Sequence, residues 1–265
     1  GLTKILPSDP AAGKRYGASV AVSGNLLAVG ATNDQSSGAT LGAAYIYGRQ
    51  NNAWQQITKI VPPNPQGQSI GHSVALSGDT LLLGAQNGAA YVYDRNQGGA
   101  NAWGGTATLK PSATQGIGLF GWSVGISSDS AIVGSTVERA AYIFDRDNGG
   151  PNKWGETKRL TPQGGMQPER FGFTTAISGD IAIVGAMYES SKGPEAGAAY
   201  IFERDRGGAD NWGQAVRLVP SDLQEYDRFG QGVAVDGNTA VVGAWWNDGN
   251  GAQSGAAYVF QRDFS

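Results

Sequence analysis

The sequence predicts an all-β protein, a five-bladed β-propeller of four-stranded antiparallel blades. Three observations predict it: a phrase that recurs five times, short apolar runs separated by glycine turns, and an N-terminal segment that matches the outer strands of the repeats. The phrase opens at Gly17, Gly71, Gly121, Gly172 and Gly230, with spacings of 54, 50, 51 and 58 residues. A period near 50 residues is typical of repeat architectures. Because one unit is too small to bury a core, residues 1–265 form a single domain, with units beginning near 16, 70, 120, 171 and 229.

Two short strands joined by a tight turn open each unit. In the fourth unit they are residues 174–177 and 181–184, separated by a turn that contains Gly179 and Asp180. A Gly-Asp or Gly-Asn pair between two apolar runs predicts a hairpin, because these residues tolerate positive φ. The same reading holds for the other four units.

The third strand of each unit is the most uniform, reading Ala-Ala-Tyr followed by two apolar residues, as in residues 198–202. An arginine follows two residues after each copy, and five equal copies indicate a role in the scaffold. A glycine-rich loop then leads to a tryptophan that begins a fourth strand and precedes an apolar-x-Pro ending. These tryptophans are Trp54, Trp103, Trp154 and Trp212.

The fifth unit has no fourth strand of its own in the sequence, which ends soon after the fifth third strand. Residues 4–7 read Lys-Ile-Leu-Pro and match Lys-Ile-Val-Pro at residues 59–62. We therefore expect the N-terminal strand to complete the last blade and close the ring. A linear solenoid would need no such exchange between its ends.

Composition excludes several classes of function. The net charge is −3 and Lys and Arg form no run, which excludes a basic nucleic-acid or anionic-membrane surface. Without cysteine there are no disulfides and no thiolate metal sites. No apolar stretch is long enough for membrane insertion, and no signal peptide begins the chain. We expect a monomer or one domain of a longer chain.

The repeated phrase resembles the FG-GAP repeat of integrin α-chain propellers and many bacterial extracellular proteins. Its strongest copies are Phe229-Gly230 with Gly243-Ala244, and Phe171-Gly172 with Gly185-Ala186. The family's closing proline is absent, and Tyr16 and Ile70 replace the aromatic in units one and two. The resemblance implies an extracellular or cell-surface location and an adhesion role.

The resemblance does not extend to the family's calcium sites. Metal-bearing family repeats place an Asp-rich loop between the first and second strands, whereas here only Gly-Asp, Gly-Asn or, in unit three, Ser128-Asp129 joins them. Such a connection is too short to offer the six or more oxygens that Ca²⁺ takes. Asp79, Asp129 and Asp180 are therefore interpreted as turn formers, and we expect no metal and no cofactor.

The candidate binding site lies in the loops between the second and third strands. These loops are short in units two and three and long in units one, four and five, which are neighbours in a closed ring. Loops on a fixed frame commonly carry recognition. Together with the loop before unit five, they supply the candidate ligand residues Trp245, Trp246, Asn247, Asp248, Tyr226, Arg228, Tyr188, Glu189, Asn33 and Asp34.

Exposed aromatics beside Asn and Asp suit a sugar ring or a protein surface. We therefore expect a non-enzymatic recognition domain whose partner is a protein or glycan on a cell surface or matrix. A carbohydrate-binding lectin and a structural module of a larger surface protein are the alternatives. An enzyme is disfavoured, because the single histidine, His72, has no nucleophile motif near it.

Overall fold

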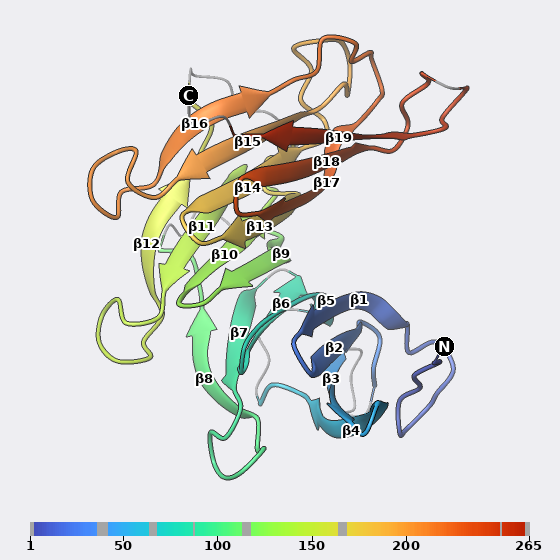
Figure 1. Cartoon of the computed structure of the whole chain (residues 1–265), viewed down its shortest axis with the longest axis vertical. Coiled ribbons are helices and arrows are strands. Elements are labelled where there is room, and N and C mark those ends of the chain that lie inside the picture. The colour runs from blue at the N-terminus through green and yellow to red at the C-terminus, as the bar shows by residue number, and fades with distance from the viewer. Residues whose placement is uncertain are drawn as a thin grey trace.

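The computed structural model describes residues 3–35, 42–63, 68–86, 88–112, 118–163, 169–249 and 251–262. These residues form no helix and five antiparallel sheets, four of four strands and one of three. In each sheet the strands pair in chain order, so every sheet is a meander. Figure 1 shows the sheets following one another along an arc, from the first sheet at lower right to the last at upper right.

The strand bounds agree with the predicted repeat. Sheet one contains β1 (Tyr16–Ser23), β2 (Leu26–Ala31), β3 (Ala43–Gln50) and β4 (Ala53–Ile60). Sheet two contains β5 (Gln68–Ser77), β6 (Thr80–Gln86), β7 (Ala89–Asp94) and β8 (Gly104–Leu109). Sheet three contains β9 (Phe120–Ser127), β10 (Ser130–Ser135), β11 (Ala140–Asp145) and β12 (Gly155–Leu160). Sheet four contains β13 (Thr174–Ser178), β14 (Ile181–Ala186), β15 (Ala198–Glu203) and β16 (Gly213–Leu218), and sheet five contains β17 (Phe229–Asp236), β18 (Thr239–Ala244) and β19 (Ala256–Gln261).

The hairpin turns between first and second strands form where Gly-Asp and Gly-Asn predict them. Ser178 pairs with Ile181, so two residues make the turn, and Gly179 has φ +54°. In sheets one to four, a serine at the end of the first strand ties that sheet to the next. Its hydroxyl oxygen accepts a hydrogen bond from the following sheet's turn: Gly78 N to Ser23, Ser128 N to Ser77, Gly179 N to Ser127 and Gly237 N to Ser178, at 2.9–3.1 Å.

Consecutive sheets pack with their backbones in close approach at glycines. A Cβ on Gly185, in the second strand of sheet four, would collide with the carbonyl oxygen of Gly230 in sheet five. Gly230 is at φ +91°, and a Cβ there would meet the carbonyl of Ala198. The glycines of the repeated phrase are therefore required by the contact between sheets as well as by the local backbone.

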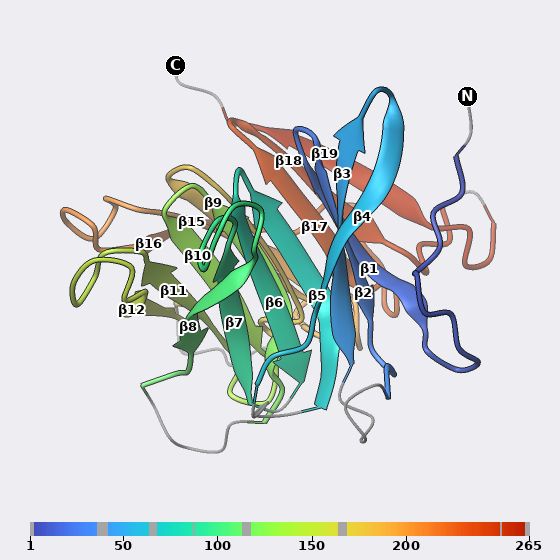
Figure 2. The same cartoon turned by 90° about the horizontal axis from the view of Figure 1, so that it is seen from below.

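An apolar core lies between each pair of consecutive sheets. Between sheets three and four, Ile143 and Leu160 pack against Phe171, Tyr200 and Phe202. All five side chains are at most 2% exposed. Figure 2 shows β1 and β5, first strands of neighbouring sheets, side by side near the middle of the molecule. Since each sheet buries both faces only between two neighbours, the core is distributed along the arc.

The two end sheets leave their outward faces exposed. Val20 and Val22 of β1 are 65% and 66% exposed, whereas Val74, at the position of Val20 in sheet two, is 7% exposed. At the other end Val259 of β19 is 63% exposed, whereas its counterpart Ile143 in sheet three is fully buried. These valines occupy positions that a neighbouring sheet covers elsewhere in the arc.

The described residues do not form the fourth strand expected for the last sheet. Sheet five has three strands, and residues 4–7 contain no strand. Instead, Ile5 packs on the apolar cluster of sheet one that contains Tyr45 and Tyr47, and the Tyr47 hydroxyl donates to the Leu6 carbonyl at 3.1 Å.

The physical reason lies in how outer strands pack. Leu160 of β12, at the position that matches Ile5, packs on Tyr200 and Phe202 of the next sheet. An apolar residue of the outer strand thus contacts the following sheet as well as its own. Ile5 makes that contact with sheet one and does not need β19 to bury its side chain.

Candidate functional site

A polar network lies at the base of the loops between second and third strands. Four residues after the second-strand glycine, four sheets place an acid or amide: Asp34, Glu138, Glu189 and Asn247. In sheets one, three and four this acid accepts a hydrogen bond from the third-strand tyrosine or forms an ion pair with a basic residue of the fourth strand. Sequence reasoning missed this equivalence, although the fixed offset from glycine was a signal for it.

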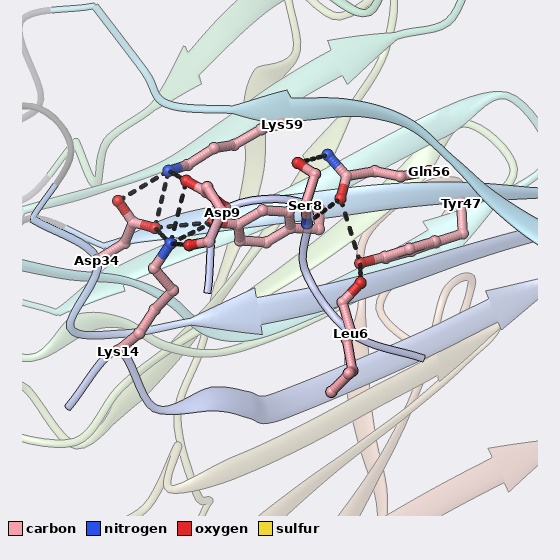
Figure 3. A network of polar contacts seen from close by, with 9 residues as sticks. Leu6, Ser8, Asp9, Lys14, Asp34, Tyr47, Gln56 and Lys59 are labelled. Carbon is pink, nitrogen blue, oxygen red and sulfur yellow. Dashed lines mark hydrogen bonds and ion pairs between the residues drawn. The ribbon is translucent and has the colours of Figure 1, made fainter. Parts of the chain in front are cut away.

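In sheet one the network is an alternating set of charges (Figure 3). The carboxylate of Asp34, 1% exposed, contacts the ammonium of Lys14 at 3.0 Å and that of Lys59 at 2.8 Å. Both lysines also contact Asp9, at 3.0 and 2.7 Å. The Tyr45 hydroxyl, at 2.7 Å from Asp9 and 2.8 Å from Asp34, completes the network. Two cations and two anions compensate one another, which makes their partial burial tolerable.

This network predicts an acid-sensitive contribution to stability. Burial acts to raise the pKa of Asp9, but hydrogen bonds from Lys59, Tyr45 and Lys14 outweigh it and lower the pKa from 3.8 to about 2. A carboxyl whose pKa is lower in the folded state stabilises the fold above its unfolded pKa and loses that effect as pH falls. Urea unfolding of the wild type and Asp9→Asn should therefore differ by a constant free energy above about pH 4 and converge towards pH 2. A difference that is unchanged at pH 2.5 would contradict the ion-pair role of Asp9.

Several candidate ligand residues belong to the frame beneath the loops. Glu189 is 2% exposed and pairs with Arg217 at 2.7 Å. Asn247 is 8% exposed and donates to the buried carboxylate of Asp227 at 2.8 Å. The Asp248 carboxylate accepts from the backbone N–H of Gln253 and so holds its own loop. With Asp34, these side chains have protein partners and support the loops.

A second group of candidates forms an exposed cluster between sheets four and five. The indoles of Trp245 and Trp246 stack with centroids 5.9 Å apart and planes 9° from parallel. The Arg228 guanidinium lies 3.6 Å from the Trp246 ring and 5.2 Å from the ring of Tyr188. Trp245 is 51% exposed and Tyr226, in the same loop as Arg228, is 48% exposed. We call Trp245, Trp246, Arg228, Tyr188 and Tyr226 the aromatic–arginine cluster.

Glu195, which the sequence reasoning did not single out, fixes this cluster. Its carboxylate accepts from Arg228 Nε at 2.9 Å and Nη2 at 2.7 Å. Backbone bonds run alongside, from Arg228 N to the Glu195 carbonyl and from Tyr226 N to the Pro194 carbonyl, at 3.1 and 2.7 Å. The long loop of unit four is thus tied to the loop before unit five, and Arg228 carries this support to Trp246 in the long loop of unit five, which preorganises the stacked rings.

The loop of unit one does not join this cluster through any contact of the described residues. Asn33 donates its amide N–H to the Gly13 carbonyl at 2.7 Å, and Asp34 belongs to the sheet-one network. Part of this loop, residues 36–41, lies outside the described residues. The structure therefore brings together the candidates of units four and five and leaves those of unit one with sheet one.

The repeated arginines lie at the opposite edge of the sheets and connect neighbouring sheets, as predicted. Arg146 contacts Asp94 of the preceding sheet at 3.4 Å. Arg204 contacts Asp145 at 3.5 Å, and Arg262 contacts Glu203 at 3.2 Å. The scaffold role of these arginines is confirmed for these three junctions.

His72 packs in a row of rings that crosses three sheets. Its imidazole lies 4.4 Å from Trp122, which lies 5.4 Å from Phe173. Burial lowers the pKa of His72, which favours the neutral form. Within the described ranges, no group of three or more His, Cys, Asp or Glu side chains could hold a metal ion.

A family model now accounts for the repeat. The model of the FG-GAP repeat matches residues 2–47, 154–202 and 212–260, more than half of the chain. The chain belongs to the FG-GAP repeat family. Two of the matched units begin at Trp154 and Trp212, just before the fourth strands of sheets three and four, and end in the third strand of the following sheet. An FG-GAP unit in this family model therefore starts at the outer strand of one sheet and continues through the first three strands of the next sheet. The match to residues 2–47 begins in the same way, so it aligns the N-terminal segment with the outer strands of the other units.

Solved structures resemble this FG-GAP chain in fold. The computationally designed Ika8 protein matches with a TM-score of 0.57 and 12% identity, over 92% of this chain and 70% of the designed one. The designed Ika4 protein matches with a TM-score of 0.49 and 12% identity, over 76% and 99% of the two chains. No curated protein matches the chain. The described residues contain no helix with the length and apolar character to cross a membrane.

Proposed function

We propose that this FG-GAP chain is a non-enzymatic recognition domain that binds an extracellular partner through its loop face, at the aromatic–arginine cluster. The observation that carries the proposal is the Trp245 indole, 51% exposed and stacked on Trp246, which Arg228 and Glu195 hold in place. A rigid exposed aromatic anchor supplies contact area at low entropic cost. FG-GAP repeats are typical of extracellular or surface proteins, which supports an adhesion role.

The chemistry of the cluster favours a partner with apolar faces and hydrogen-bonding edges. A glycan ring or a protein surface rich in aromatic and acidic groups has that character, since Arg228 adds a cation beneath the indoles. The loop of unit one, with Asn33, would reach this surface only in a closed ring.

The test compares Trp245→Ala/Trp246→Ala with Val137→Ala, a control at an exposed apolar residue in the short loop of sheet three. Wild type and control should bind the same glycans on an array, or retain the same proteins from surface extracts, and the double variant should lose that binding at least tenfold. Binding that survives in the double variant would contradict the proposed site. Loss of glycan binding would identify a lectin, and loss of protein binding an adhesion domain.

We further propose that the arc closes into a five-bladed ring through the N-terminal strand. In sheet four, Ala199 pairs with Leu218, so the equivalent register places Ile5 opposite Ala257 of β19. Gly243 supports closure: it lies in the interior of β18, where glycine weakens a strand, yet no described residue of another sheet lies within 4 Å of a Cβ at this position. Asp236 is exposed and occupies the position at which the first strands of the other sheets have serine. In a closed ring its carboxylate would accept a hydrogen bond from the backbone N–H of Gly24, in the first turn of sheet one.

A further inference from the structure

The junction between sheets one and two lacks the ion pair that joins the later sheets. At those junctions an arginine reaches the acid that ends the third strand of the preceding sheet, as Arg204 reaches Asp145 at 3.5 Å. Arg95 is the equivalent arginine of sheet two, but Gly48 takes the place of the acid in sheet one. Among the described residues, the one carboxylate paired with Arg95 is that of Asp79 in its own sheet, at 3.2 Å. Arg95 therefore has no described acid across the junction.

A cavity of about 470 Å³ lies at this junction. Its lining contains the guanidinium groups of Arg49 and Arg95 and the apolar side chains of Leu26 and Ile57, and no carboxylate belongs to the described residues that line it. Five side-chain amides complete the lining, those of Asn25, Gln50, Gln55, Gln56 and Asn101. Arg49 forms no ion pair with any described residue, and its side chain donates one hydrogen bond, to Asn52 at 3.3 Å.

The equivalent cavity between sheets three and four has the opposite charge. Its volume is about 670 Å³, and Arg146 and Arg204 stand in it at the positions of Arg49 and Arg95. Five carboxylates also line it, those of Asp129, Asp145, Asp147, Asp180 and Asp210. Four of the five have uncharged counterparts in the first cavity, which are Asn25, Gly48, Gln50 and Asn101. The first cavity has thus kept both cations and lost the anions that neutralise them elsewhere.

The groups that hold the acid in the later sheets have changed together with it. The Asp145 carboxylate accepts hydrogen bonds from the hydroxyls of Ser130 and Thr157, both at 2.5 Å. Their counterparts in sheet one have no hydroxyl, and they are Leu26 and Ile57. A Cβ on Gly48 would lie 2.9 Å from Ile57 Cδ1, so the isoleucine takes up space where an acidic side chain would begin. The cavity therefore combines two cations and several amides with an apolar wall.

We propose that this cavity binds the anionic group of an acidic saccharide, a carboxylate or a sulfate, between Arg49 and Arg95. A guanidinium group binds carboxylates and tetrahedral oxyanions through paired N–H donors. The amides can donate to and accept from the hydroxyls of the same sugar, and the apolar wall suits the C–H face of its ring. A volume of about 470 Å³ lies within the range of small-molecule sites.

The number of amides favours a saccharide over an acidic peptide. A single aspartate or glutamate side chain would satisfy the arginines and leave most of these amides without a partner. The site lies at the arginine edge of the sheets, away from the aromatic–arginine cluster. Because sheets one and two are both described and pack directly on each other, the site depends neither on ring closure nor on the proposed loop-face partner.

Calorimetric titration of the full chain with three oligosaccharides tests the proposal. Oligogalacturonate carries carboxylates, a carrageenan oligosaccharide carries sulfates, and a maltooligosaccharide carries neither. At least one of the two acidic probes should bind with saturation, and which of them binds identifies the anionic group. The neutral probe should not bind, and added salt should weaken the binding of the acidic one.

Asn25→Asp is the decisive variant, because it restores the acid that sheets two, three and four carry in this turn. There the acid pairs with the arginine of its own sheet, as Asp129 pairs with Arg146 at 2.6 Å. The new carboxylate would pair with Arg49 and lower the affinity by at least about tenfold, without lowering the melting temperature. Asn238→Asp is the matched control, since it makes the same substitution in the turn of sheet five and should bind as wild type does.

Two further variants separate this site from its alternatives. Arg49→Gln removes an exposed cation and should weaken binding as Asn25→Asp does. Trp245→Ala/Trp246→Ala should bind the acidic oligosaccharide as wild type does, because these indoles belong to the loop face. Loss of binding in that variant would place the acidic saccharide at the aromatic–arginine cluster and overturn the proposal.

Other outcomes would overturn it as well. Wild-type affinity in folded Asn25→Asp would contradict the site, and an equal loss in Asn238→Asp would show that overall charge is the cause. A glutamate-rich peptide that binds more tightly than either acidic oligosaccharide would contradict the saccharide. Absence of binding of both acidic probes to folded wild type at millimolar concentration would contradict the anion site altogether.

Discussion

Replacing Gly185 with alanine is expected to destabilise the protein by about 3 kcal/mol, at the upper end of overpacking costs. The added Cβ would make a severe steric clash with the Gly230 carbonyl oxygen, a backbone atom that cannot rotate away. Sheets four and five would have to separate locally. In a chain of this size the melting temperature should fall by roughly 6–12 °C. Gly105→Ala, whose Cβ would meet the Tyr93 ring at an ordinary 3.5 Å, is the matched control and should not lower it.

The same substitution at Gly243 tests ring closure, because Gly243 is the counterpart of Gly185 in the last sheet. In the arc as described, a Cβ on Gly243 meets nothing closer than 3.8 Å, and alanine would stabilise the strand slightly. In the proposed closed ring, the Gly17 carbonyl would approach Gly243 and alanine would cost about as much as at Gly185. We expect the large loss; a neutral Gly243→Ala variant would show that the arc stays open in solution.

Trp212→Ala is expected to lower the free energy of unfolding by about 3–5 kcal/mol, the range for removing a buried large aromatic side chain. Trp212 is 2% exposed, packs between sheets three and four, and lies beneath Arg204 at 5.0 Å. Its removal would leave a cavity in the core between sheets three and four. Urea unfolding with a linear extrapolation measures the loss.

Trp54→Ala is the control for this experiment. In the open arc Trp54 is only partly buried and lies beside the sheet-one cluster, so its loss should cost clearly less. Equal losses would indicate that sheet five covers Trp54 in the closed ring, as sheet three covers Trp212. A Trp212→Ala variant as stable as the wild type would contradict the packing role of Trp212. The third-sheet equivalent, Trp154, should behave like Trp212, since it is 2% exposed and Arg146 covers it.

Local pattern predicted the strands well. The third strand predicted at residues 198–202 is β15, Ala198–Glu203, and the fourth-unit hairpin turns at Gly179 as expected. The fourth strands differ, because they begin one residue after the tryptophan in sheets two, three and four. Trp154 itself has φ +52°, outside the strand region, since its ring turns into the interface between sheets.

The candidate site shows where prediction from local pattern stops. Long loops and their aromatics pointed to the surface that Trp245 and Trp246 form. The same reasoning could not separate exposed Trp245 from Asn247, two residues later, whose amide is bound to a carboxylate at 2.8 Å. Burial of a loop residue depends on its partner twenty residues away, Asp227, and the sequence does not give that distance in space.

By itself, the sequence determined the repeat, the antiparallel sheets and the positions of turns and inter-sheet glycines, because these depend on residue type at a fixed spacing within one unit. Only the tertiary structure decided which faces are buried, which acids find a cation and where the N-terminal segment lies. Ile5 packs on Tyr45 and Tyr47 of sheet one, as the equivalent Leu160 packs on the sheet after its own, yet residues 4–7 form no strand beside β19. Apolar burial has no direction, so a side chain that suits two faces goes to whichever the folded chain brings within reach.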